Sequence, residues 1–158
     1  MRTWFSSIWQ GLRASFWFIP TIMIALAVAG AAAVITVDRR MSDEWLDHTN
    51  WLYSGGADGA ATLLGAIAGS MVTIAGTVFS LTLVALSLAS NQFGPRLLRN
   101  FMRDRANQIV LGTFLATFIF SVLILRAVRR EDYDAFVPHL GVTLSVLLSL
   151  LSVLVLIY

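Results

Sequence analysis

The chain has 158 residues, of which 58% are hydrophobic and 13% are charged, and its formal net charge is +2. Soluble domains average about 45–50% apolar and about 25% charged residues, so this composition excludes an ordinary soluble domain. Cysteine is absent and all 11 basic residues are arginines, which excludes a thiolate catalyst, a Schiff-base lysine and the lysine of a Walker-type phosphate loop. The charges gather between long apolar runs, as in membrane proteins with several helical spans.

The first 15 residues place large apolar side chains on one face of a predicted helix and arginines toward the other. This pattern predicts a short amphipathic segment at the membrane interface. A secretory signal peptide is the alternative, but the apolar run is too long and too rich in Trp. We predict the first span at residues 16–37, with Pro20 in its first turn, where a missing N–H costs little.

Residues 38–58 form a polar, acidic and aromatic loop that we expect to rest on the membrane surface. His48 stands near Asp43, Glu44 and Asp47, which suggests a metal site. The loop lacks the paired His or Cys spacing of zinc sites. We therefore interpret it as a solvated acidic loop and expect no metal and no cofactor.

The second predicted span, residues 59–91, is the one around which we expect the other helices to gather. It is longer than the about 30 Å hydrocarbon core requires, so it must tilt, break or project. Six polar residues share one helical face because they recur at steps of three, four and seven: Ser70, Thr73, Thr77, Ser80, Ser87 and Asn91. Gly65, Gly69 and Gly76 lie beside them and let helices approach closely. This face could line a permeation path in an oligomer, or it could pack helices together.

A Gly-Pro pair ends the second span, and an arginine-rich segment follows at residues 96–105. Arg96, Arg99 and Arg103 recur on one face of a predicted in-plane helix, where they would meet anionic lipid headgroups. They could equally serve only to fix the topology. The segment lies between two spans and has a single aromatic residue, so we expect lipid phosphate rather than nucleic acid as its partner.

The third span is predicted at residues 106–125 and the fourth at residues 136–158. Small and hydroxyl residues form a face on the third span: Gly112, Thr113, Ala116, Thr117 and Ser121. Three serines recur at helical spacing on the fourth span: Ser145, Ser149 and Ser152. Gln108 could shape a polar cap or be a plain interfacial amide. His139 could sense external pH or be a hydrogen-bonded interfacial histidine.

These elements predict an all-α fold: a polytopic membrane protein with four transmembrane helices and short amphipathic interfacial helices, in one domain over residues 1–158. If both termini are cytoplasmic, six arginines lie on the cytoplasmic side of the membrane and five on the other side. By the positive-inside rule this distribution favours cytoplasmic termini. No charge interrupts a span interior and no enzyme motif is present, so we expect neither an ion-coupled carrier nor an enzyme. We expect a homo-oligomer, because small and hydroxyl faces on three helices exceed what one unit must bury.

Three motifs carry a resemblance to a known family: SFWFIP at residues 15–20, NQFGPR at residues 91–96 and FVPHL at residues 136–140. With the apolar runs between them, the chain resembles the uncharacterised bacterial predicted-membrane-protein family known as domain of unknown function 2254. Asn91 stands where the family pattern leads us to expect a serine. The resemblance implies a bacterial cytoplasmic (inner) membrane location and a soluble carboxy-terminal region that this sequence lacks. It implies no activity, substrate or catalytic residue.

Two functional hypotheses follow. The first is an oligomeric channel-like pore lined by the second helix. The alternative is a structural or sensory membrane anchor for a cytoplasmic carboxy-terminal region.

Overall fold

The computed structural model describes residues 18–40, 56–93, 105–129 and 136–157. Within these residues the chain forms four α-helices: α2 (Phe18–Asp38), α3 (Ala57–Phe93), α5 (Arg105–Ala127) and α6 (His139–Ile157). All four are long and apolar enough to cross a membrane, and they correspond to the four predicted spans. The prediction of an all-α membrane fold is confirmed. The expected amphipathic segments, residues 1–15 and most of residues 96–105, lie outside the described residues.

Proline marks where two of these helices begin. Pro20 is the third residue of α2, and Pro138 directly precedes α6. At the start of a helix the missing N–H removes no intrahelical bond. The carbonyl of Pro138 also accepts the N–H of Val142 at 2.9 Å, which closes the first turn of α6.

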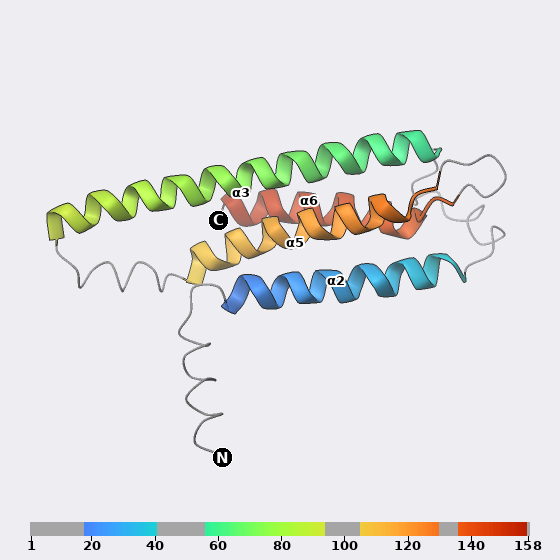
Figure 1. Ribbon diagram of the computed structural model, residues 1–158, viewed down its shortest axis with the longest axis horizontal. Helices are drawn as coiled ribbons and strands as arrows, with labels where there is room; N and C mark the ends of the chain where they lie inside the picture. Colours follow the sequence, from blue (N-terminus) through green and yellow to red (C-terminus); the bar gives the residue numbers. More distant parts are fainter. Residues whose placement is uncertain (1–17, 41–55, 94–104, 130–135, 158) are drawn as a thin grey trace, which may run out of the picture.

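The central helix of the bundle is α5, which packs against α2, α3 and α6 (Figure 1). Half of its apolar segment (50%) is buried, against 11% to 22% for the other three. The expectation that the other helices gather around the second span is therefore wrong. The physical reason is that α3 does not bury its hydroxyl face on its neighbours, whereas the small residues of α5 let three helices approach it.

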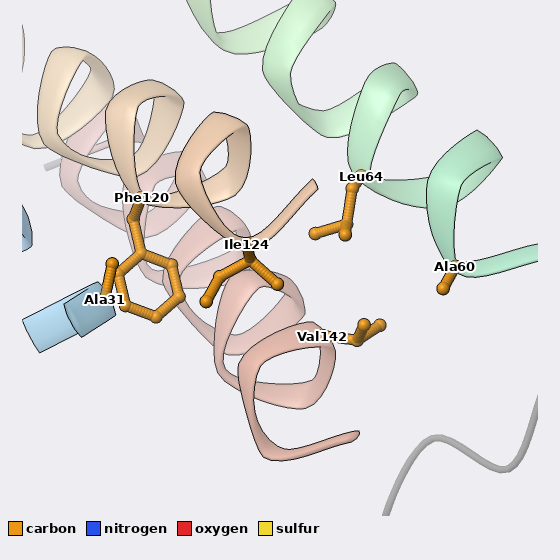
Figure 2. Close-up of a cluster of buried hydrophobic side chains, with 6 residues drawn as sticks. All are labelled: Ala31, Ala60, Leu64, Phe120, Ile124 and Val142. Carbon is orange, nitrogen blue, oxygen red and sulfur yellow. The ribbon is translucent and has the colours of Figure 1, made fainter. Parts of the chain in front are cut away.

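One cluster of buried apolar side chains joins all four helices, with Ile124 of α5 in its middle (Figure 2). Its members are Ala31, Ala60, Leu64, Phe120, Ile124 and Val142. A second cluster joins α3 to α5 further along the bundle, through Ile67, Met71, Ala75, Leu111 and Phe114. The apolar face of α3 is therefore buried against α5 from residue 60 to residue 75.

Helix α3 is longer than its partners and continues without a break past the amino-terminal end of α5 (Figure 1). The hydroxyl of Thr82 donates to the Asn107 Oδ1 at 3.3 Å, which marks where α3 passes the first turn of α5. Eleven residues of α3 (83–93) follow Thr82, and they extend about 16 Å at 1.5 Å per residue. The helix therefore does not break, and it projects beyond its partners.

The opposite end of the bundle is tied by contacts between α2, α5 and α6. The Asp38 carboxylate, at the end of α2, accepts the backbone N–H of Leu140 at 3.2 Å and that of Gly141 at 3.1 Å. The Arg39 guanidinium lies 5.6 Å from the centre of the Phe136 ring. The N–H of Arg129 donates to the Phe136 carbonyl at 3.0 Å, in an isolated antiparallel bridge. Phe136 is therefore held between residues that follow α2 and α5.

Candidate functional site

The candidate site is the hydroxyl face of α3, which points away from the other three helices. Ser70, Thr73, Thr77, Ser80 and Ser87 are all exposed. The buried residues Leu64, Met71 and Ala75 lie on the opposite side of the same helix, as expected from the rotation of 3.6 residues per turn. The predicted shared face is therefore present, and it is exposed rather than buried against the other helices. The side chain of Asn91 lies outside the described part of the structure.

Hydroxyls on this face donate to carbonyls of their own helix. Ser70 Oγ donates to the Ala66 carbonyl at 2.9 Å, Thr73 Oγ1 to the Gly69 carbonyl at 2.8 Å and Thr77 Oγ1 to the Thr73 carbonyl at 3.0 Å. Each hydroxyl therefore uses its proton locally and keeps lone pairs that can accept further bonds. The face presents a row of uncharged oxygen acceptors, which can replace part of the hydration shell of an ion or hold water.

The three glycines beside these hydroxyls are also unused within the bundle. A Cβ placed on Gly65, Gly69 or Gly76 would meet nothing within 4 Å. Close approach at glycine occurs elsewhere in the chain. A Cβ on Gly112 would lie 2.6 Å from the Met23 Sδ, and one on Gly141 would lie 2.8 Å from the Ile124 Cδ1. Gly112 of α5 and Gly141 of α6 thus serve packing inside the chain, and these three glycines of α3 do not.

Hydroxyls of α5 and α6, in contrast, lie inside the bundle. The Thr117 and Ser152 hydroxyl oxygens are 2.8 Å apart in a buried pair between these helices. Ser145 is fully buried and donates to the Gly141 carbonyl at 2.9 Å. Ser121 Oγ is buried and has no hydrogen-bond partner among the described residues. The small and hydroxyl faces of α5 and α6 are therefore packing surfaces of a single chain, whereas that of α3 faces outward.

Comparison with known proteins gives the chain a family. The model of a family described as "Predicted membrane protein (DUF2254)" matches residues 13–158. The chain belongs to this family. The resemblance inferred from the three sequence motifs is thus confirmed, and the DUF2254 match supports a membrane-embedded protein.

Curated relatives of this DUF2254 chain are uncharacterised proteins of Mycobacterium bovis and of two strains of Mycobacterium tuberculosis. Each is 37% identical over 148 residues, which cover 93% of this chain and 28% of the relative. The chain therefore spans less than a third of the length of these relatives. No solved structure matches it.

The DUF2254 structure also contains polar contacts that no sequence pattern predicts. The sequence predicts Asp38 in a loop, yet its carboxylate accepts two N–H groups at the start of α6. Asn107 contacts α3 through Thr82, whereas its neighbour Gln108, which the sequence analysis singled out, is buried. No spacing rule connects such distant residues, so pattern reading had no signal for them.

Two of the predicted sites in this DUF2254 chain lie outside the described residues. One is the set of arginines proposed to meet lipid headgroups, Arg96, Arg99 and Arg103. The other is the loop with His48 and its acidic neighbours. His139 is the first residue of α6 and is half-buried. Among the described residues, the outward face of α3 is thus the candidate site that the structure supports best.

Proposed function

We propose that this protein forms an oligomeric channel-like pore in which α3 helices of several copies surround a narrow path. One observation carries the proposal: α3 turns an uncharged face of hydroxyls and glycines away from its own bundle. A closed ring of identical subunits would place these faces toward a common axis. The row of hydroxyl oxygens would then line the path, with the apolar side of α3 packed on α5.

The glycines of α3 support contact with something outside the single chain. In a helix interior each glycine is less favourable than alanine by about 1 kcal/mol. Nothing lies within 4 Å of a Cβ on Gly65, Gly69 or Gly76, so the bundle itself does not need them. Small residues let transmembrane helices approach closely, and a neighbouring copy of α3 is the partner that this face fits.

The absence of cysteine from the chain allows a direct test by single-cysteine variants in proteoliposomes. We expect Thr73→Cys and Thr77→Cys to react with a charged, water-soluble thiol reagent, because the reactive thiolate forms in contact with water. The reaction should reduce ion flux. Leu26→Cys on α2 and Leu154→Cys on α6, which replace exposed apolar residues, are the controls and should stay unreactive.

A second variant tests the same lining without a reagent. We expect the double substitution Thr77→Leu and Ser80→Leu to reduce flux strongly, because it removes two oxygens and narrows the path. Equal flux from this variant and from wild type would contradict the proposed lining. Equal labelling of the α3 and control cysteines would contradict it as well.

A role as a structural or sensory anchor is the second candidate, and the length of the relatives favours it. The matched segment is 28% of each mycobacterial protein, so the spans would hold a much larger region at the membrane. The test compares the full-length protein with its spans expressed alone. Spans that keep the full ion flux would contradict anchoring as the main role.

The proposed setting is the bacterial cytoplasmic membrane, with both termini and the projecting end of α3 in the cytoplasm. The starts of α2 and α5 and the carboxyl end of α3 lie at one end of the bundle (Figure 1), so all three would be cytoplasmic. Arg96, Arg99 and Arg103 would then meet anionic headgroups of the inner leaflet. A single cysteine at residue 3 that reacts with an impermeant reagent in intact spheroplasts would contradict this orientation.

A further inference from the structure

A surface pocket of about 540 Å³ opens beside the last turns of α2. Its described lining comes from the last turns of α2 and the two residues that follow the helix: Ala32, Ile35, Thr36, Arg39 and Arg40. The pocket lies at the end of the bundle that is tied by Asp38 and Phe136. It is separate from the hydroxyl face of α3.

The part of the pocket toward the middle of α2 is apolar. Thr36 Oγ1 donates to the Ala32 carbonyl at 2.7 Å, so the hydroxyl is turned onto the helix and its methyl group remains on the surface. Ala32 is exposed and small, and Ile35 adds a branched wall. Because α2 is a candidate membrane span, this groove lies at a depth where acyl chains surround the protein.

The other end of the pocket carries two exposed guanidinium groups, those of Arg39 and Arg40. Arg39 is held over the ring of Phe136, which orients its planar group. The neighbouring acid, Asp38, directs its two oxygens to backbone N–H groups of α6, so it is engaged away from the arginines. Guanidinium groups are well suited to phosphate, because their fork of donors matches its oxygens.

We propose that this pocket binds one anionic phospholipid, with its phosphate against Arg39 and Arg40 and an acyl chain along Ala32 and Thr36. The pocket would recognise a ligand in which a phosphodiester is joined to an apolar chain. It lies at the level where α2 leaves the membrane. This site lies at the opposite end of the bundle from the carboxyl end of α3 (Figure 1). Bound lipid would bridge α2 to the start of α6 through the arginine that stacks on Phe136.

The test is native mass spectrometry of the purified protein in detergent, titrated with phosphatidylglycerol, phosphatidylcholine or water-soluble glycerophosphoglycerol. We expect phosphatidylglycerol to bind best and glycerophosphoglycerol, which lacks acyl chains, to bind least. Arg40→Gln should weaken phosphatidylglycerol about fivefold, the effect of one basic group at an anionic lipid surface. Ala32→Phe fills the groove while both charges remain, and it should weaken binding at least as much.

Matched controls separate a built site from general attraction. Arg126→Gln removes an exposed charge at the same end of the bundle, and Ala33→Phe adds the same ring beside the pocket; both should bind phosphatidylglycerol as wild type does. Equal weakening by Arg40→Gln and Arg126→Gln would overturn the proposal, because the attraction would then be diffuse. Unchanged binding by Ala32→Phe, or glycerophosphoglycerol binding as tightly as the lipid, would overturn it by removing the acyl chain from recognition.

Discussion

The Asp38 carboxylate accepts a hydrogen bond from the backbone N–H of Gly141, 103 residues away in the sequence, at 3.1 Å. The N–H groups at a helix start have no intrahelical acceptor. The Asp38 side chain of α2 therefore caps the start of α6. This contact joins the end of α2 to the start of α6. It is a polar contact that binds two helices of the bundle directly.

Removing this cap should destabilise the fold. We expect Asp38→Ala to lower the free energy of unfolding by about 0.5–2 kcal/mol, the range for losing a helix cap. Asp38→Asn keeps one acceptor oxygen and should lose about half as much. Unfolding in mixed micelles with increasing dodecyl sulfate measures both. A loss equal in the two variants would show that charge, rather than acceptor geometry, matters at this position.

The glycine of α6 that faces Ile124 should be far less tolerant than the glycines of α3. A Cβ on Gly141 would lie 2.8 Å from the Ile124 Cδ1 and 2.9 Å from its Cγ2, so Gly141→Ala should cost about 1–3 kcal/mol through overpacking. Gly65→Ala is the matched control because its Cβ would meet nothing, and it should be neutral or stabilising. The same unfolding assay reports both, and equal losses would contradict the packing of α6 on α5.

If the protein self-associates through α3, a substitution on the exposed face of this helix should change the oligomeric state but not the fold of the single chain. Gly69→Leu should leave unfolding within about 0.5 kcal/mol of wild type, since the site is exposed. The same change should shift the protein toward monomer in light scattering of the detergent complex. Ala29→Leu, at an exposed position of α2, is the control and should keep the wild-type mass. An unaltered mass for Gly69→Leu would argue against an interface at this face.

The buried pair of hydroxyls between α5 and α6 should contribute a small, measurable coupling. Thr117 and Ser152 lie 2.8 Å apart through their oxygens, and interhelical bonds of this kind average about 0.6 kcal/mol in a membrane protein. A double-mutant cycle with Thr117→Val and Ser152→Ala measures that coupling. The cycle of Thr113→Val with Ser152→Ala is the control, because Thr113 donates to the Ile109 carbonyl of its own helix. A coupling near zero for the first cycle would mean that the two hydroxyls do not bond.

Much of this fold was predictable from the sequence because long apolar runs in a membrane protein have one regular solution. In lipid the backbone must satisfy its own hydrogen bonds, so each run becomes a helix. The spacing of Ser70, Thr73 and Thr77 likewise predicted a shared helical face, which the structure contains. Whether this face turns toward the other helices or away from them was not predictable. Each of these hydroxyls bonds within its own helix, so polarity does not force the face inward, and the apolar contacts of Leu64 and Met71 decide the packing.

Contacts between distant residues were the other part that pattern reading could not supply. The match of Gly141 to Ile124, like the bond from Gly141 to Asp38, depends on how α2, α5 and α6 are placed relative to one another. The sequence shows each partner only as a small residue or as a charge near a span end. The central place of α5 follows from such contacts and not from helix length, so the longest helix, α3, is not the centre of the bundle.

The unbroken course of α3 has a mechanical consequence. A continuous α-helix behaves as a stiff rod, so its projecting end and its hydroxyl face share a single angle about the helix axis. A rotation of the end beyond Thr82 would turn the row of oxygens through the same angle, and it would also shift the contacts that Leu64 and Met71 make with α5. The length that carries α3 past its neighbours therefore couples the orientation of its projecting end to that of its hydroxyl face.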